Sequence, residues 1–279
     1  MSAGEVRELL ARHGLRAQKS RGQNFLVDEA LAERLVDLAG VEAGDGVIEI
    51  GTGLGVLTRA LARRAARVVT LEVDAGLVRA LRAEAALPAH VELLHADVLR
   101  ADLPALAASF AGPLRAVANL PYSISAPALR RLLDLRERLA DWSVMLQREV
   151  ARRLLGQPGT REYGSLGVLH RLAVQVEPRL ELPPGCFYPV PRVRSSFVRI
   201  APLAQARLAP GELPRIEAFL RRAFGQRRKT LANALRGAAP PGAALRALAR
   251  AGVDPRTRAE ALAPERLLEV ARALAAEGA

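Results

Sequence analysis

The sequence has little of the material from which disulfides, metal sites and membrane spans are made. Cys186 is the only cysteine, which excludes an intrachain disulfide. None of the histidines, His13, His90, His95 and His170, has metal-ligand spacing, so we expect chemistry without a protein-bound metal. There is no apolar run of about 18 residues and no signal-peptide pattern at the N-terminus. We therefore expect a cytoplasmic protein that does not associate with membranes.

Lysine is also scarce: only Lys19 and Lys229 occur, and arginine carries nearly all of the positive charge. The net charge is +12 and the pI is near 11.2. Such an excess favours a polyanionic partner, above all nucleic acid. It is concentrated in residues 203–279, which hold 14 Lys and Arg against 7 Asp and Glu. Basic solvent-facing helices, or a compositional bias toward arginine, would give the same numbers, so both alternatives stay open.

Short runs of valine, isoleucine and leucine alternate with longer helical patterns between residues 47 and 147. This rhythm is typical of parallel βαβ units and predicts an α/β fold with a doubly wound, Rossmann-like sheet. The expected strands are 47–50, 68–71, 91–94, 114–118 and 143–146, and the expected helices are 56–66, 75–86 and 127–139. Two further extended segments, 173–182 and 196–200, flank a proline-rich stretch that predicts a hairpin-like excursion at the sheet edge.

After residue 202 the strand pattern stops and helical patterns take over. These helices are expected at 212–224, 228–236, 243–251 and 264–275. We therefore predict an α/β domain over residues 1–202, which includes a basic N-terminal segment at 1–28. A small, basic, all-helical domain is predicted over residues 203–279.

The turn Asn119-Leu120-Pro121-Tyr122 follows the expected strand 114–118. It combines a side-chain amide, a proline-stiffened turn and an aromatic ring, which together can hold a flat ring that bears an amine. Asn119 Oδ1 and the Leu120 carbonyl can accept the two amine hydrogens. Pro121 fixes the turn and Tyr122 offers a surface for stacking. The alternative is an ordinary strand-ending turn with a buried tyrosine.

Gly51, Gly53 and Gly55 form a G-x-G-x-G turn between the first expected strand and a helix. Glycines let the chain pass close to a ligand and aim helix-end N–H groups at it. The spacing differs from the G-x-G-x-x-G of dinucleotide-binding turns, which weakens a nicotinamide or flavin hypothesis. S-adenosylmethionine, which has no pyrophosphate, fits the turn better.

Two acidic residues fall at the ends of the next expected strands, at the edge where ligands gather in open α/β sheets. Glu72 is placed to hold both ribose hydroxyls of the cofactor, and Asp97 to accept from its adenine amine. Either acid alone could be a solvated strand end or a helix cap. With Asn119 at the following strand end, the set predicts that the acceptor turn lies beside the cofactor's methyl group.

These features make the sequence similar to the KsgA/RsmA-type ribosomal RNA adenine dimethyltransferases over nearly the whole chain. Gly22-Gln23-Asn24-Phe25-Leu26 resembles the family's GQNFL segment. Residues 187–195 resemble its F-x-P-x-P-x-V-x-S signature, residues 224–231 its F-x-x-R-R-K-T-L motif, and residues 258–262 its R-A-E-x-L turn. Arg194 departs from the carboxylate or amide that we expect there, which leaves the local loop contacts open.

The resemblance implies roles for individual residues. Asn24, Leu26, Gly51, Glu72, Asp97 and Asn119 would border S-adenosylmethionine. Phe187 would face Tyr122 across the target adenine, with a structural phenylalanine in a proline-rich loop as the alternative. The residues expected at RNA phosphates are Arg21, Arg221, Arg222, Arg227, Arg228 and Lys229. The basic motif that contains several of them could instead hold the helical domain together.

By the same resemblance, residues 1–202 are the methyltransferase domain, to which residues 1–28 add cofactor and RNA contacts, and residues 203–279 bind RNA. The expected reaction is N6,N6-dimethylation of two adjacent adenosines in the 3′-terminal hairpin of small-subunit ribosomal RNA. It would take place on the immature 30S particle during ribosome biogenesis. A monomer is expected.

Other functions stay open at this point. Related enzymes carry out the same chemistry on large-subunit ribosomal RNA or on adenine in DNA, although the sequence contains no DNA-recognition domain. Protein methyltransferases acting on glutamine use a similar Asn-Pro-Pro-Tyr turn but lack the Phe187 loop and the helical tail. A non-catalytic RNA-binding assembly factor would have degraded cofactor residues, whereas the glycines, both acids and Asn119 are intact here.

Overall fold

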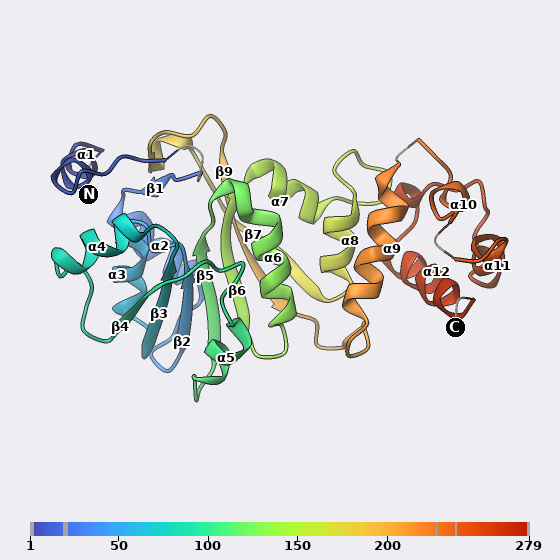
Figure 1. Cartoon of the computed structure of the whole chain (residues 1–279), viewed down its shortest axis with the longest axis horizontal. Coiled ribbons are helices and arrows are strands. Elements are labelled where there is room, and N and C mark those ends of the chain that lie inside the picture. Colours follow the sequence, from blue (N-terminus) through green and yellow to red (C-terminus); the bar gives the residue numbers. More distant parts are fainter. Residues whose placement is uncertain (1–2, 19–21, 227, 238, 278–279) are drawn as a thin grey trace. The chain divides into compact units, whose positions relative to one another are not determined.

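The computed structural model describes residues 3–18, 22–226, 228–237 and 239–277 (Figure 1). The chain divides into two compact units. The N-terminal unit consists of Met1–Ala151 and Glu177–Pro202, and the helical unit consists of Arg152–Val176 and Leu203–Ala279. The sequence placed the division at residue 202, and the structure adds residues 152–176 to the helical unit.

The N-terminal unit is built on a seven-stranded sheet with the strand order β4-β3-β2-β5-β6-β9-β7. The strands are β2 (Gly46–Ile50), β3 (Arg67–Glu72), β4 (Val91–His95), β5 (Leu114–Asn119), β6 (Asp141–Gln147), β7 (Val174–Leu182) and β9 (Ser195–Pro202). Strands β2 to β6 run parallel, and β9 runs antiparallel to β6. The predicted doubly wound α/β fold class is therefore confirmed, including the excursion at the sheet edge.

The helices lie on both faces of this sheet. They are α2 (Glu29–Ala39), α3 (Val56–Ala62), α4 (Ala75–Ala83), α5 (Leu103–Ala108) and α6 (Ser125–Asp134), whereas α7 (Arg148–Leu155) begins in this unit and ends in the helical unit. From β2 the chain moves through β3 to β4 toward one edge, and from β5 to β6 toward the other. Right-handed crossovers then place α3 and α6 on opposite faces, as Figure 1 shows. A ligand crevice is expected where this order reverses, at the carboxyl ends of β2 and β5.

One face of the sheet is covered by α2 and α3. Leu35 of α2 and Leu61 of α3 are completely buried and share a hydrophobic cluster with Val117 and Phe197 of the sheet. Helix α2 begins where the Asp28 side chain accepts a hydrogen bond from the Leu31 N–H. This hydrogen bond satisfies one of the free N–H groups in the first turn of α2.

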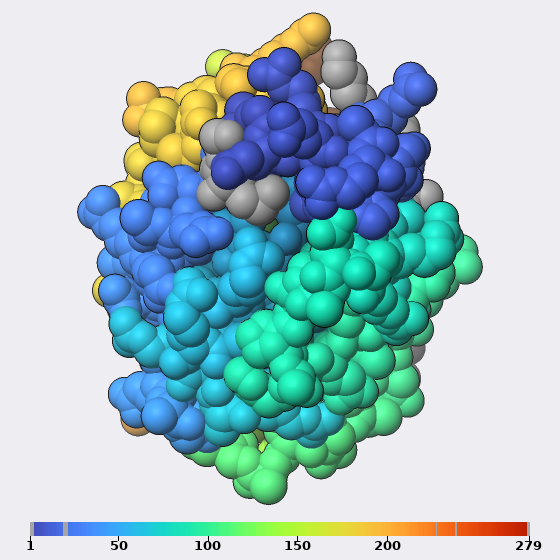
Figure 2. Space-filling view, turned by 90° about the vertical axis from the view of Figure 1, so that its left-hand side faces the viewer, coloured from blue at the N-terminus to red at the C-terminus, as the bar shows by residue number. Residues whose placement is uncertain are grey.

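The N-terminal residues pack beside that edge. Helix α1 (Ala3–Arg12) contributes Val6 and Leu10 to a cluster that contains Phe25 and Leu77. Figure 2 shows the N-terminal residues, in dark blue, against the turquoise residues that follow β3. Strand β1 (Phe25–Leu26) pairs antiparallel with β8 (Phe187–Tyr188) in a separate two-stranded sheet. The sequence did not predict this small sheet.

The helical unit contains α8 (Ser165–Arg171), α9 (Leu213–Gly225), α10 (Leu231–Ala234), α11 (Ala243–Arg250) and α12 (Pro264–Ala276). The buried Tyr163 explains why residues 152–176 belong to it. Its ring meets Phe224 edge-on with centroids 5.7 Å apart, and its hydroxyl donates to the Leu262 carbonyl at 2.8 Å. Within the described part of the chain, no helix combines the length and apolarity that a membrane crossing needs.

Candidate active site

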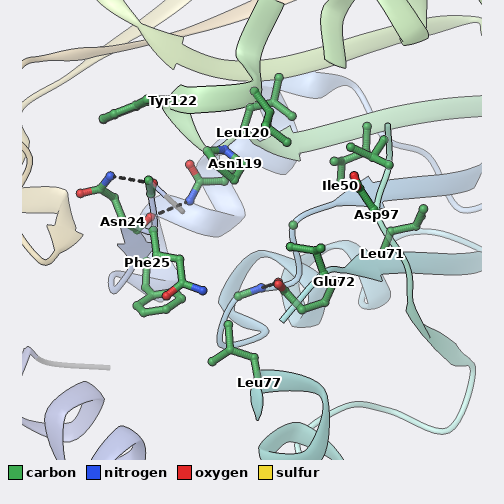
Figure 3. A pocket seen from close by; sticks show the side chains of 18 of the residues that line it. Asn24, Phe25, Ile50, Leu71, Glu72, Leu77, Asp97, Asn119, Leu120 and Tyr122 are labelled. Atoms are coloured by element: carbon green, nitrogen blue, oxygen red, sulfur yellow. Dashed lines mark hydrogen bonds between the residues drawn. The ribbon is translucent and has the colours of Figure 1, made fainter. Parts of the chain in front are cut away.

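A cavity opens at the carboxyl ends of β2, β3, β4 and β5, where the strand order reverses. The empty space within it, its open mouth included, is about 710 Å³. The predicted residues in its lining are Asn24, Gly51, Gly53, Glu72, Asp97, Asn119, Leu120, Pro121 and Tyr122. Figure 3 shows Asn24, Asn119 and Tyr122 toward one end, and Ile50, Leu71 and Asp97 toward the other. Sheet topology thus brings together residues from five distant segments.

Gly51 lets two of these segments meet. It follows β2 with a φ of +86°, a conformation that side chains disfavour. A Cβ atom there would lie 3.3 Å from the Asn119 carbonyl oxygen. The glycine turn can therefore pass directly against the turn after β5, which carries the predicted acceptor groups.

Glu72 ends β3 and is 5% exposed. Its Oε1 accepts from the Asp74 N–H and its Oε2 from the Gly53 N–H, both at 2.9 Å. Burial raises the pKa of Glu72, and these backbone donors oppose the rise. Each carboxylate oxygen can accept more than one hydrogen bond, so this group suits a ligand with two neighbouring hydroxyls.

Asp97 follows β4 in the part of the cavity lined by the apolar side chains of Ile50, Leu71 and Val98. Its Oδ1 accepts from the Leu99 N–H at 2.9 Å, which orients the carboxylate. An acceptor beside apolar walls suits a flat aromatic ring with an amine group.

The Asn119 amide is held in one orientation. Its Nδ2 donates to the Asn24 carbonyl at 3.1 Å, and the Asn24 side chain donates to the Gly22 carbonyl at 3.0 Å (Figure 3). Because the donor end of the Asn119 amide is engaged, Oδ1 is the end left to accept from a ligand. This is the acceptor that the sequence analysis assigned to an incoming amine.

Tyr122 begins the short 3-10 turn Tyr122–Ile124 and is half-buried. Its hydroxyl hydrogen-bonds the Ser195 hydroxyl at 2.8 Å. Burial raises the pKa of Tyr122 above its ordinary value of 10.0, so the phenol is neutral at neutral pH. Tyr122 therefore offers the cavity an uncharged aromatic ring rather than a base.

The N-terminal segment is fastened over the cavity by Asp74, which lies two residues beyond Glu72. The side chains of Gln18 and Gln23 donate to Asp74 Oδ2 at 3.2 and 3.0 Å. Asp74 Oδ1 accepts from the Gly76 N–H at 2.9 Å and so caps α4. One carboxylate thus connects the start of α4 to the residues that precede Asn24.

Some predicted residues lie elsewhere. Leu26 and Phe187 are register partners in the small sheet, are 4% and 2% exposed, and pack in the hydrophobic core. Phe187 is absent from the lining of this cavity, and its place opposite Tyr122 stays a prediction. Gly55 also lies outside the lining and precedes α3 with a φ of +75°. Arg21 and Arg227 fall outside the described residues.

Gln23, Phe25 and Leu77 also line the cavity, and the sequence patterns did not predict them. The signal for Phe25 was present in the motif. Phe25 and Leu26 form a two-residue strand, in which neighbouring side chains point to opposite faces. One therefore turns to the cavity and the other to the core, and Phe25 is the residue that turns to the cavity.

Glu49 lies in the same glycine-rich motif but belongs to the core. It is completely buried, and its Oε2 accepts from the hydroxyls of Thr58 and Thr70, both at 2.6 Å. Burial raises the pKa of Glu49 to about 8. The raised pKa favours the protonated acid at neutral pH, and its hydrogen bonds join β2, β3 and α3.

The predicted RNA contacts differ in their surroundings. Arg221 pairs with Glu217 at 3.1 Å, one turn earlier in α9. Arg222, Arg228 and Lys229 are exposed, and none forms an ion pair with another described residue. These three side chains carry charge that the rest of the described chain does not neutralise.

Comparison with known proteins shows the family. The family described as "Ribosomal RNA adenine dimethylase" matches residues 14–276. A protein of Magnetococcus marinus named "Ribosomal RNA small subunit methyltransferase A" is 42% identical over 259 residues, 93% of this chain and 92% of its own length. A protein of the same name from Anaeromyxobacter sp. is 44% identical over 268 residues, 92% of this chain and 93% of its own length.

Solved structures share the fold. A 23S rRNA methyltransferase, ErmE, superposes with a TM-score of 0.64 at 27% identity, covering 90% of this chain and all of that chain. A dimethyladenosine transferase from Plasmodium falciparum gives a TM-score of 0.74 at 23% identity, covering 88% of this chain and 95% of that chain. The match to the family extends over both units and includes every segment that forms the cavity. The chain therefore belongs to the ribosomal RNA adenine dimethylase family.

Proposed function

We propose that this protein transfers methyl groups from S-adenosylmethionine to the N6 atoms of two adjacent adenosines in the 3′-terminal hairpin of small-subunit (16S) ribosomal RNA, each methylated twice. The observation that carries the proposal is the Asn119 amide, whose donor end is engaged by the Asn24 carbonyl at 3.1 Å. One turn at the cavity carries three groups: Asn119 Oδ1, the Leu120 carbonyl and the Tyr122 ring. An aromatic ring that bears an amine fits these groups, because the two oxygens can accept from the amine and the tyrosine can stack on the ring.

The cavity residues fit S-adenosylmethionine. Glu72 would hold the two ribose hydroxyls, and Asp97 would accept from the adenine amine. Gly51 and Gly53 line the cavity without side chains and would allow close approach to the methionine part. When bound, S-adenosylmethionine would supply a methyl group for attack by an amine nitrogen, with the neutral thioether as the leaving group and the amine's proton released to solvent. The separation of Asp97 from Asn119 along the cavity in Figure 3 suits an extended ligand with its methyl group near Asn119.

The protein would catalyse the reaction mainly by orienting the N6 amine toward the methyl carbon. Asn119 Oδ1 and the Leu120 carbonyl would accept the two hydrogens of the N6 amine, which keeps its lone pair directed at the methyl carbon. The target base must leave its stack at a cost of a few kcal/mol, and aromatic stacking returns about 1 to 3 kcal/mol per base. Tyr122 would supply that stacking. Because its phenol is neutral, no step uses Tyr122 as a base.

The choice of small-subunit RNA is supported by similarity. The relatives named for the small subunit are 42% and 44% identical, whereas the 23S rRNA methyltransferase is 27% identical. The non-catalytic alternative is not favoured, because Glu72, Asp97 and Asn119 share one cavity. We further propose that the protein acts as a monomer on the immature 30S particle in the cytoplasm.

We expect Asn119→Ala to lower kcat by about 10² to 10³, as removal of one group that stabilises a transition state does. The assay supplies labelled S-adenosylmethionine with immature small subunits, naked small-subunit RNA, large-subunit RNA or DNA, and the methylated base is mapped. The RNA affinity of the variant should stay close to the wild-type value. Near-normal turnover by Asn119→Ala, or label confined to large-subunit RNA or DNA, would contradict the proposal.

A further inference from the structure

We propose that Ser195 is a positioning residue for Tyr122, and that its buried hydroxyl fixes the plane in which the tyrosine ring meets the target base. The inference rests on the proposed function, since it assumes that Tyr122 stacks on an adenine. The observation behind it is the 2.8 Å hydrogen bond between the Tyr122 and Ser195 hydroxyls. These residues lie 73 positions apart in the chain.

The Tyr122 ring needs such a contact because the backbone alone does not set its plane. The rotation of a tyrosine ring about its second side-chain torsion is broad and two-fold, unlike the staggered torsion nearer the backbone. Tyr122 also lies in a short 3-10 turn beyond the end of β5, outside the regular sheet. A hydrogen bond at the far end of the ring restricts that rotation and the tilt of the ring together.

Ser195 is well placed to provide it. It is completely buried, begins β9 and stands opposite Gln147 of β6 in the antiparallel ladder. Strand β6 in turn pairs with β5, where Met145 stands opposite Asn119. The sheet that carries the Asn119 amide thus also carries the hydroxyl that holds Tyr122. The Asn119 amide and the Tyr122 ring are therefore both held by the same sheet.

Ser195 acts through Tyr122 rather than on a ligand. It is absent from the lining of the cavity, whereas Tyr122 is part of it. Burial keeps the Tyr122 pKa raised, so the phenol hydroxyl remains a neutral hydrogen-bonding group. The contact can orient the ring without taking part in methyl transfer.

The test compares Ser195→Ala, Tyr122→Phe and the double variant. Each single variant removes the same hydrogen bond and keeps the aromatic ring, so each should lower kcat/KM for the RNA about 3- to 10-fold. The double variant should be no worse than either single variant, because both changes act on one interaction. Affinity for S-adenosylmethionine should not change in any of them.

Ser196→Ala is the matched control. Ser196 is the next residue of β9, is 2% exposed, and its hydroxyl donates to Glu181 instead of Tyr122. This variant should retain the wild-type kcat/KM while carrying a similar loss of one buried hydroxyl. If Ser196→Ala and Ser195→Ala lose activity equally, the effect is general to β9 and the proposal is wrong.

A second readout does not depend on turnover. The chain has three tyrosines, so protein labelled with 3-fluorotyrosine gives few fluorine resonances, and Tyr122→Phe identifies the one from Tyr122. Ser195→Ala should shift or broaden that resonance, and Ser196→Ala should leave it unchanged. An unchanged resonance in Ser195→Ala, or additive activity losses in the double variant, would overturn the role of Ser195. Wild-type protein that methylates no adenosine would instead overturn the proposed function.

Discussion

The two units of the chain differ in which polar groups keep unused hydrogen-bonding or charge capacity. In the N-terminal unit, Glu72, Asp97 and Asn119 turn toward one cavity and keep acceptor capacity for a ligand. In the helical unit, the described acidic side chains are largely engaged in ion pairs with arginines, some of them with two. Glu212 pairs with Arg215 at 2.9 Å and Arg272 at 2.8 Å. From this difference we propose that the functional groups are those whose capacity is not used up by partners among the described residues: acceptors that face the cavity in the first unit, and unpaired cations such as Arg222, Arg228 and Lys229 in the second.

The same distinction separates two acids within the N-terminal unit. Glu49 and Glu72 stand on the neighbouring strands β2 and β3, both buried. Glu49 is enclosed by threonine hydroxyls and lies outside the cavity, whereas Glu72 lines it. Proximity to the glycine-rich turn is therefore not enough to make an acid a ligand-binding group.

The largest effect is expected from Glu72→Gln. Replacing the carboxylate weakens two hydrogen bonds to the ribose, and bonds to charged groups contribute about 1.5–3 kcal/mol each. Since about 1.4 kcal/mol corresponds to a factor of ten, we expect the Kd for S-adenosylmethionine to rise about 100-fold. Isothermal titration calorimetry measures this directly.

Glu49→Gln is the control on the adjacent strand. It makes the same chemical change, and its Kd for the cofactor should stay within about threefold of wild type, a difference of less than 1 kcal/mol. Thermal unfolding of both variants checks that each is folded. If both variants lose cofactor affinity equally, Glu72 has no special role in cofactor binding compared with the enclosed Glu49.

A smaller effect is expected on the pH dependence of stability. The pKa of Glu49 is about 8 in the folded protein against an ordinary value of 4.5. Between these values the folded state keeps a proton that the unfolded state releases, so this group makes the protein less stable as the pH rises. The slope is at most about 1.4 kcal/mol per pH unit for one such group.

Glu49→Gln should remove this slope, because an amide does not titrate. Melting temperatures measured from pH 5 to pH 8 should fall more steeply for the wild type than for the variant. Parallel curves would show that Glu49 is ionised in the folded protein. That outcome would also place Glu49 among the charged groups near the cavity.

The sequence predicted the cavity well because strand ends are local signals that a parallel sheet brings together. Gly51, Glu72, Asp97 and Asn119 each follow a recognisable apolar run, and the carboxyl ends of such strands meet at one edge. Phe187 and Leu26 were less predictable. Their placement depends on the pairing of β1 with β8, which joins segments more than 150 residues apart. No local pattern specifies that register.

The helical unit was harder to predict for a different reason. Helical periodicity located α9, α11 and α12, but residues 152–176 join them through tertiary packing of Tyr163. Net charge predicted a basic surface without saying which side chains remain unpaired. Arg221 and Arg222 are neighbours in sequence, yet only Arg221 has an acidic partner one turn away.

Arg221 and Arg222 can be compared by the salt dependence of RNA binding. If Arg222 contacts a phosphate, Arg222→Gln should reduce the slope of log K against log salt by about 0.7 to 0.9, and Arg228→Gln and Lys229→Gln should do the same. Arg221→Gln should reduce it less, because Glu217 already offsets its charge. Binding of small-subunit RNA is measured at several salt concentrations with each variant.

The slope separates contact from structure because it counts phosphate contacts and not folding stability. Lower stability with an unchanged slope in Arg228→Gln and Lys229→Gln would assign the basic motif to the packing of the helical unit. Equal slope changes in Arg221→Gln and Arg222→Gln would mean that the ion pair to Glu217 opens when RNA binds. In that case an arginine without an ion pair in the free protein would not identify the RNA-binding surface. The link between unpaired groups and function would then hold only for the acceptors in the cavity.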